Sequence, residues 1–255
     1  MPFEAAIIIA ISILVITFVV MVILITSRRQ AAKEEEMKRV ASARGWQFAV
    51  VREKGYRIHR WTGTTEGVSW VAESLSQGAG GQSRQKRRWH VARWHGNWSP
   101  GINGAIVAMG LPKGQEQLEA TIAAGESWVA KLAQKAVGFA LDKAIDIYFG
   151  EGPGKEIDAG ALHRIETKIP GFVVMAADKD EGARVLTQGL EKALVDAAND
   201  KASVLSNEQR PWILLRPHAV SLARMERFRD VNELEGFIRA GVALTRSSKF
   251  SRPFV

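Results

Sequence analysis

AAIIIAISILVITFVVMVILIT, residues 5–26, is a run of 22 positions without a charged side chain. At about 1.5 Å per residue, a helix of this length spans roughly 33 Å, which matches the bilayer's hydrocarbon core of about 30 Å. The hydroxyl groups of Ser12, Thr17 and Thr26 can bond back to carbonyl oxygens of the same helix. The run therefore predicts a transmembrane helix, and we expect residues 1–26 to form an N-terminal membrane anchor.

A cleaved signal peptide is the alternative interpretation of this run. Such a peptide has a basic start, an apolar stretch of about 7–15 residues and a cleavage site of small residues. Here residues 1–4, MPFE, contain no Lys or Arg, the apolar stretch is longer, and Ser27-Arg28-Arg29 follows it. These differences favour an anchor that stays attached to the chain.

Basic residues beside the run predict its orientation. The positive-inside rule places the flank richer in Lys and Arg in the cytoplasm. Only the amino terminus and Glu4 precede the run, whereas five basic residues follow it closely: Arg28, Arg29, Lys33, Lys38 and Arg39. We therefore expect the N-terminus outside and residues 27–255 in the cytoplasm.

The composition is that of a folded protein. Of 255 residues, 46% are hydrophobic and 24% are charged, which excludes disorder along the whole chain. The absence of cysteine excludes a disulfide framework, a thiolate zinc site, a cysteine-held iron–sulfur cluster and a thiol nucleophile. The formal net charge of +8 favours an anionic partner over a cationic one.

Charge divides the rest of the chain into regions. Residues 27–43 are charged and favour a helix, so we expect a helical connector there. Residues 44–110 form a basic, Trp-rich β-region, since positions 40–110 hold ten Lys or Arg against three Asp or Glu. Residues 111–255 are expected to be an α+β region that folds as one unit with residues 44–110.

Short runs of aromatic and β-branched residues predict an early antiparallel sheet. Turn signals rich in Gly, Pro and Asn separate them, and Ser76–Lys86 (SQGAGGQSRQK) predicts a polar hairpin loop. The predicted strands are Trp46–Val51, Tyr56–Trp61, Val68–Glu73, Arg87–Trp94 and Ala105–Met109.

The second half predicts helices between single strands. Apolar residues at spacings of three and four predict a long amphipathic helix over Gln115–Phe149, ended by Gly150. Later elements are strand Phe172–Ala177, a helix Gly182–Asn199 capped by Asp178 or Asp180, strand Trp212–Leu215, and a helix Val231–Thr245 capped by Asp230. The predicted fold class is α+β: one transmembrane helix, then a cytoplasmic domain with an early antiparallel sheet, a long amphipathic helix and later strand–helix units.

Motifs for catalysis or for cofactors are not found. Gly154-Lys155 resembles part of a phosphate loop, but Phe149 replaces the required glycine and Glu156 the required Ser or Thr. His90 and His95 lie five apart on a predicted strand and should point to opposite faces, which does not suit a metal site. We expect no catalytic, cofactor-binding or metal-binding residues.

A basic aromatic segment is the candidate site for an anionic partner. Six of the eight tryptophans fall within residues 46–98. The candidate residues are Arg84, Lys86, Arg87, Arg88, Trp89, Arg93, Trp94 and Trp98. Exposed arginine and tryptophan side chains can bind anionic lipid headgroups or, less favourably here, single-stranded nucleic acid, and they are also common at protein interfaces. Alternatively, strand alternation turns the tryptophans inward to form a core, and this interpretation explains the spacing without a ligand.

The layout of the chain resembles a known group of proteins. Its segments RGWQF (44–48), RWTGTTEGVSW (60–70) and GFVVMAADKDEGARVL (171–186) follow the apolar N-terminus. In this respect the chain is similar to uncharacterised bacterial membrane-anchored proteins known only as a domain of unknown function. The last segment corresponds to that group's strand–Asp–helix pattern, with Asp178 at its centre. The resemblance implies a bacterial inner membrane, and it implies no activity.

These features together predict a non-enzymatic, single-pass inner-membrane protein. Its cytoplasmic domain would act as a scaffold or accessory subunit of a larger membrane assembly, with membrane proteins as partners. One alternative is a module that binds anionic lipid, or less favourably nucleic acid, through the basic aromatic segment. A membrane-anchored enzyme without a recognisable motif is the other.

Overall fold

The structure is a computed structural model of the chain. It describes residues 2–53, 56–77, 90–98, 101–111, 141–150, 152–153, 156–167, 169, 171–192, 194–195, 210–226, 228 and 230–247. The chain forms two compact units, Met1–Phe48 and Ala49–Val255.

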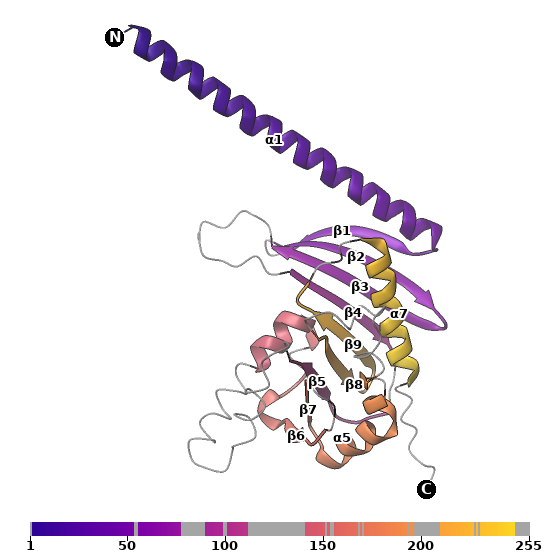
Figure 1. Cartoon of the computed structure of the whole chain (residues 1–255). Helices are drawn as coiled ribbons and strands as arrows, with labels where there is room; N and C mark the ends of the chain where they lie inside the picture. Colours follow the sequence, from indigo (N-terminus) through magenta and orange to yellow (C-terminus); the bar gives the residue numbers. More distant parts are fainter. Residues whose placement is uncertain are drawn as a thin grey trace, which may run out of the picture. The chain divides into compact units, whose positions relative to one another are not determined.

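The first unit is built on one long helix, α1 (Pro2–Ala43). The helix is apolar and long enough to cross a membrane, and none of the described apolar window is buried against protein. Thr17 Oγ1 donates to the carbonyl of Ile13 at 2.8 Å, and Thr26 Oγ1 donates to that of Val22 at 2.8 Å, so these hydroxyls bond within the helix as expected. The candidate membrane span and the charged segment 27–43 belong to the same continuous helix (Figure 1).

Gly45 ends the helix. Its φ of 70° lies in the left-handed region, which glycine adopts without steric cost. Trp46 N–H then donates to the carbonyl of Ala41 at 2.8 Å, which satisfies a carbonyl that the helix would leave free. The chain continues directly into the first strand.

The second unit is built on an antiparallel sheet, which has nine strands within the described residues. The strands are β1 (Gln47–Glu53), β2 (Tyr56–Thr65), β3 (Val68–Gln77), β4 (His90–Asn97), β5 (Ile106–Gly110), β6 (His163–Ile165), β7 (Phe172–Ala176), β8 (Trp212–Arg216) and β9 (Ala219–Arg224). Their order in the sheet is β1-β2-β3-β4-β9-β8-β5-β7-β6. In this order, every pair of neighbouring strands after β1 runs antiparallel. The N-terminal strands β1 to β4 therefore join the rest of the sheet through β9, which comes last in the chain among the described strands (Figure 1).

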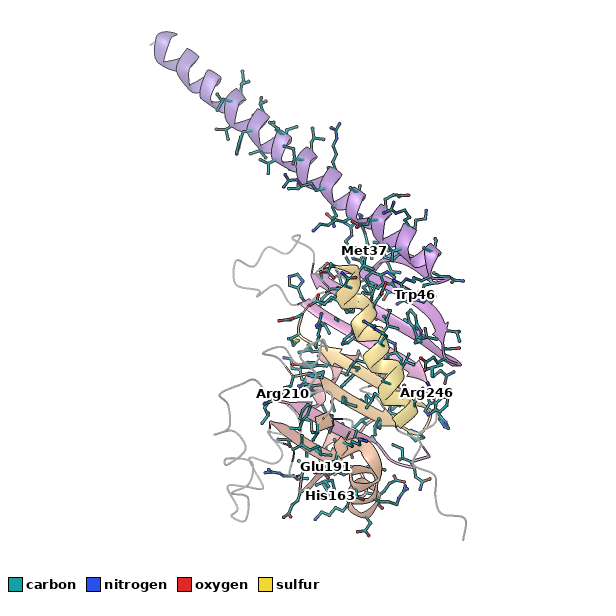
Figure 2. All side chains as sticks on the ribbon, turned by 45° about the vertical axis from the view of Figure 1, so that its right-hand side comes forward. Met37, Trp46, His163, Glu191, Arg210 and Arg246 are labelled. Carbon is teal, nitrogen blue, oxygen red and sulfur yellow. The ribbon has the colours of Figure 1, made fainter. Side chains whose placement is uncertain are left out.

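Helix α7 (Val231–Ser247) packs on one face of this sheet, across β3, β4 and β9. Asp230 caps it, accepting from Glu233 N–H at 2.9 Å, as the sequence predicts. Figure 2 shows the helix crossing the strands, with Arg246 toward its C-terminal end. Beneath it the ring of Trp94 is completely buried, and Gly241 of the helix leaves room for that ring, because a side chain at Gly241 would overlap it.

The core on this face contains an arginine. Arg224 of β9 is 2% exposed, and its Nη2 lies 3.3 Å from Oε1 of Glu233 in α7. Its guanidinium also lies 5.5 Å from the ring centre of Phe228 and 5.4 Å from that of Phe237. A buried charge needs such partners, so this pair ties α7 to the sheet.

Two further short helices cover the same face near β6 and β7. They are α5 (Lys179–Val185) and the π-helical turn η2 (Leu186–Leu190), preceded in the chain by the short 3-10 helix η1 (Ala159–Ala161). Asp178 is the cap, accepting from Glu181 N–H at 2.8 Å, so the helix begins at Lys179 and earlier than the predicted Gly182. Gly189, at φ 139°, interrupts the regular helix that the sequence predicts through this region.

The opposite face packs against a helix over residues 141–149. Leu141, Ile145 and Phe149 on this helix are buried with Val107 of β5 and Leu214 of β8. Tyr148 stacks on Trp212 with ring centres 4.3 Å apart, and burial raises the pKa of Tyr148 to about 12. Gly150, at φ 93°, ends the helix as predicted, and residues 115–140 of the predicted long helix lie outside the described residues.

The α+β class predicted from the sequence is confirmed, with one candidate transmembrane helix, an antiparallel sheet and later helices. The predicted strands correspond to β1 to β5, β7 and β8, several of them longer than expected. Strands β6 and β9 were not predicted from the sequence. The predicted hairpin loop lies largely outside the described residues.

Candidate functional site

A pocket of about 860 Å³ lies on the face of the sheet opposite α7. Strands β1 to β4 supply its floor, and the end of the 141–149 helix, the segment after it and Arg216 of β8 supply its other side. Strand alternation creates this floor, because every second residue of a strand points to the same face. Side chains at positions 91, 93 and 95 of β4 line the pocket, while that of Trp94 lies under α7.

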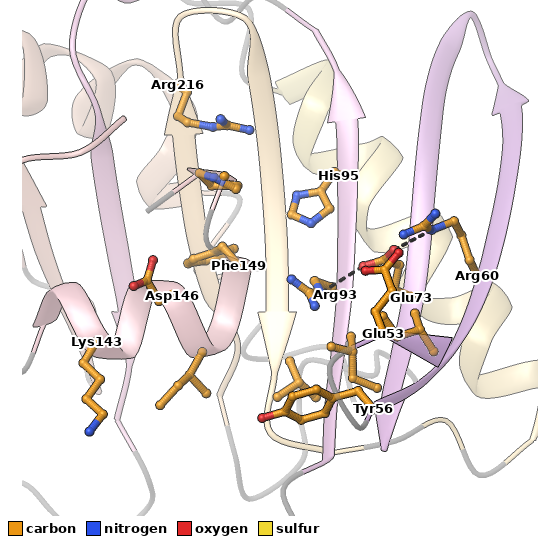
Figure 3. A pocket seen from close by; sticks show the side chains of 17 residues that line it. Glu53, Tyr56, Arg60, Glu73, Arg93, His95, Lys143, Asp146, Phe149 and Arg216 are labelled. Atoms are coloured by element: carbon orange, nitrogen blue, oxygen red, sulfur yellow. Dashed lines mark hydrogen bonds and ion pairs between the residues drawn. The ribbon is translucent and has the colours of Figure 1, made fainter. Parts of the chain in front are cut away.

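A row of three charged side chains crosses the floor (Figure 3). Arg60, Glu73 and Arg93 stand opposite one another on β2, β3 and β4. Arg60 Nε lies 2.6 Å from Glu73 Oε1, and Arg93 Nε lies 3.0 Å from Glu73 Oε2. Glu73 is 7% exposed, and an unpaired carboxylate buried to this extent would be costly. Each of its two oxygens has an arginine partner.

Arg93 extends from this row to the end of the 141–149 helix. A side chain at Gly150 would collide with Arg93 Nη1, so the missing side chain lets the guanidinium approach. Helix C-termini carry partial negative charge, which favours a cation there. Burial lowers the pKa of Arg93, the charge of Glu73 opposes that shift, and that of Arg60 adds to it. Arginine stays protonated under these conditions, so Arg93 keeps a positive charge inside the pocket.

His95 lies one step further along β4 on the same face. Its Nδ1 is 2.9 Å from Ser221 Oγ of β9. Burial, and then the charges of Arg93 and Arg216, lower the pKa of His95 to about 3. The imidazole is therefore neutral at physiological pH, and it is a weak base.

Arg216 reaches the pocket from β8, and Figure 3 shows it directed toward His95. Its Nη1 lies 2.5 Å from Glu156 Oε2, but the Glu156 side chain is 63% exposed. Its Nε is buried and has no hydrogen-bond partner among the described residues. Arg216 thus has spare hydrogen-bonding capacity next to His95.

Apolar side chains line the pocket beside these charged groups. They come from three strands and from the helix: Tyr56, Ile58, Leu75, Val91, Ile147 and Phe149. Three further charged residues, Glu53, Lys143 and Asp146, are exposed and stand at the rim. The pocket therefore combines an apolar wall with a buried, mainly basic floor.

The structure separates the members of the candidate basic aromatic segment that it describes. Arg93 lies in the pocket, whereas Trp94 points to the other face of β4 and is 0% exposed. Trp98 is half-buried just after β4. The other five candidates lie outside the described residues: Arg84, Lys86, Arg87, Arg88 and Trp89. Trp61 and Trp70 are buried as well. These strand tryptophans therefore form a core, which is the alternative interpretation based on strand alternation.

Most of the pocket has no direct signal in the sequence. Arg60, Glu73 and His95 lie on one face of the sheet because side chains alternate along each strand. Which of these residues stand opposite one another depends on the strand register, and this cannot be read from the separate strands. Arg216 joins them through β8, more than a hundred positions later in the chain. Within the described part of the chain, no group of three His, Asp or Glu side chains is placed to hold a metal ion.

Comparisons with family models, with curated proteins and with solved structures give no match to this chain. The resemblance to bacterial membrane-anchored proteins of unknown function therefore stays a prediction. The chemistry of the pocket is inferred from its own residues.

Proposed function

We propose that this protein is a single-pass protein of the bacterial inner membrane. In this proposal residues 27–255 lie in the cytoplasm, and the sheet domain acts as a scaffold or accessory subunit of a larger membrane assembly. The anchor itself is the best supported part, because α1 is long and apolar enough to cross a membrane.

The exposure of α1 is the observation that carries the proposal. Its large apolar side chains from Ile13 to Ile25 are 40–70% exposed and occur on all sides of the helix. A water-soluble helix instead places its apolar residues on one face, against a core. An exposed apolar surface of this extent is stable in lipid.

The basic flank supports the cytoplasmic orientation. Arg28 and Arg29 follow the apolar part of α1 within the same helix, while the preceding residues include no Lys or Arg. Positive charges beside a span are retained on the cytoplasmic side. The proposal therefore assigns the sheet domain to that compartment.

The pocket chemistry supports a binding role over a catalytic one. Glu73 is held between two guanidinium groups, and the low pKa of His95 makes it a poor general base at neutral pH. Glu73 is suited to holding the two guanidinium groups in place, and His95 is poorly suited to accepting a proton at neutral pH.

Single cysteines test the anchor and its orientation without background, because the chain contains no cysteine. Glu4→Cys and Arg239→Cys, the second on the exposed side of α7, are each expressed at full length. A membrane-impermeant maleimide added to intact cells should label position 4, and position 239 only after the inner membrane is permeabilised. The unsubstituted chain is the control and should stay unlabelled.

Two outcomes would contradict the proposal. Labelling of position 239 in intact cells, with position 4 protected, would reverse the orientation. Recovery of either variant in the soluble fraction after cell lysis would remove the anchor.

The proposed scaffold role is tested by purifying the tagged full-length protein in mild detergent. Mass spectrometry should find membrane-protein partners at near-equal stoichiometry. The same tag on a chain that ends at Phe48 keeps the anchor and should lose these partners. Purification of the full chain alone, or the same partners on both chains, would count against a scaffold built on the sheet domain.

A further inference from the structure

The buried part of the pocket holds more positive than negative charge. Arg93 and Arg216, whose side chains are 12% and 15% exposed, contribute two guanidinium groups against the single buried carboxylate of Glu73, and the half-exposed Arg60 adds a third. Glu156, the partner of Arg216, is 63% exposed, and an ion pair with such an exposed partner contributes little. The remaining acidic residues at the pocket, Glu53 and Asp146, are exposed at its rim, as is the basic Lys143.

His95 lies beside these positive charges. It is close enough to Arg93 and Arg216 for both charges to lower its pKa, after the effect of burial. With Nδ1 bonded to Ser221, the neutral ring keeps its second nitrogen for another partner. The buried Nε of Arg216, which has no hydrogen-bond partner among the described residues, is a second group ready to bind an acceptor.

The apolar wall and the size of the pocket define the rest of a ligand. Ile58, Leu75, Val91 and Phe149 stand beside the basic floor. The volume of about 860 Å³ falls within the range of roughly 300–1,000 Å³ that is usual for small-molecule sites. Such sites combine mostly apolar walls with a few fixed polar groups that orient the ligand.

We propose that this pocket binds a small organic oxyanion, a carboxylate or phosphate monoester with an apolar body. Its charged group is held by Arg93 and Arg216 beside His95, and its apolar part lies against Ile58, Val91 and Phe149. Arg60 and Glu73 act as positioning residues, since their ion pairs fix Arg93. This site does not depend on the proposed scaffold role, and either can fail without the other.

The test uses the full-length protein in nanodiscs of zwitterionic lipid. Phenyl phosphate and benzoate are the probes, with phenol as the neutral control, and binding is measured by calorimetry. Arg216→Gln should weaken binding of the anions by about tenfold or more, because a charge-assisted hydrogen bond is lost. Arg246→Gln is the matched control with the same change of charge, because Arg246 is exposed on α7 and pairs with Glu66.

Histidine NMR locates the bound anion. The chain has five histidines, so a protein labelled only in histidine gives few signals, and His95→Gln identifies that of His95. Phenyl phosphate should shift the His95 signal in the natural chain, and the same shift in Arg216→Gln should require about tenfold or more phenyl phosphate. Arg93→Gln should weaken binding as well, and its histidine spectrum shows whether that variant is folded.

Several results would overturn the proposal. They are no binding of either anion, equal binding of phenol, equal loss in Arg246→Gln, or binding that leaves the His95 signal in place. The oxyanion that fills the pocket could belong to a lipid headgroup or to a free small molecule. Nanodiscs containing anionic phospholipid distinguish these two sources. Weaker binding of phenyl phosphate there would identify a lipid headgroup as the occupant of the site, and unchanged binding would identify a free ligand.

Discussion

His95 shows how neighbouring charges act on a single residue. It is half-buried on β4. Burial and then the charges of Arg93 and Arg216 together lower its pKa to about 3. In the unfolded chain the same ring takes up a proton near pH 6.5. The unfolded state therefore binds more protons than the folded state between these two values, and stability falls as the pH falls through that window.

Replacing this ring should remove that pH dependence. In His95→Gln the side chain is neutral at every pH, so the natural chain should lose about 2 kcal/mol more stability than the variant between pH 7 and pH 5. Urea unfolding of the full chain in detergent, followed by tryptophan fluorescence, measures the difference. His218→Gln, at an exposed turn residue, is the control and should run parallel to the natural chain. Parallel curves for His95→Gln would show that His95 titrates normally.

Single residues of the pocket were less predictable than the strands that carry them. The basic and aromatic residues at 84–98 suggested one surface, but strand alternation places Arg93 and Trp94 on opposite faces. The pairing of Glu73 with two arginines depends on register, and the contribution of Arg216 depends on a strand far along the chain. Residue type and local spacing do not contain these long-range relations.

At the level of elements, the residues that begin and end helices are more predictable than the course of the chain between them. Asp178 and Asp230 cap their helices, and Gly150 ends another, because each acts through backbone groups within one turn. In the structure Gly45 ends α1 through its left-handed backbone. Strand β6, with three residues, and the kink at Gly189 give no periodic pattern of their own, and they form where neighbouring elements pack.

The contact between α7 and β4 is a sensitive point of the fold. Gly241→Ala adds a better helix former, worth up to about 1 kcal/mol, but its methyl group would overlap the rigid ring of Trp94. Overpacking of a core costs roughly 1–3 kcal/mol, so we expect a net loss of stability of about 1–2 kcal/mol. Urea unfolding measures it.

A double-mutant cycle separates the two effects. In a Trp94→Phe background the ring is smaller, and Gly241→Ala should cost less there or stabilise the helix. An equal cost in both backgrounds would show that the ring does not limit the substitution.

For the whole molecule, the proposed membrane insertion of α1 contributes a large favourable free energy. The run at residues 5–26 holds 15 Ile, Leu, Val and Phe residues. At about 0.3–0.6 kcal/mol each, these favour insertion by roughly 5–9 kcal/mol. One arginine at the centre costs about 2.5–3.5 kcal/mol, so the span should tolerate one, while two, at about 5–7 kcal/mol, offset most of the gain.

Paired substitutions test this estimate. Val19→Arg should stay in the membrane pellet after alkaline carbonate extraction, while Val15→Arg with Val19→Arg should move substantially to the supernatant. Ala31→Arg with Ala32→Arg adds the same two charges outside the apolar run and should remain in the pellet. Full retention of the Val15/Val19 double variant would mean that the chain is held at the membrane by something other than this span.

The position of β9 between β4 and β8 has a consequence for synthesis. Strand β4 ends at Asn97 and pairs with β9, which begins at Ala219, so the ribosome adds more than a hundred residues before that partner exists. At roughly 5–20 residues per second, the edge of β4 waits on the order of ten seconds. The middle of the sheet thus closes last, and a chain that stops before residue 219 exposes two open strand edges. Such truncated products should be aggregation-prone and readily recognised by cellular proteases.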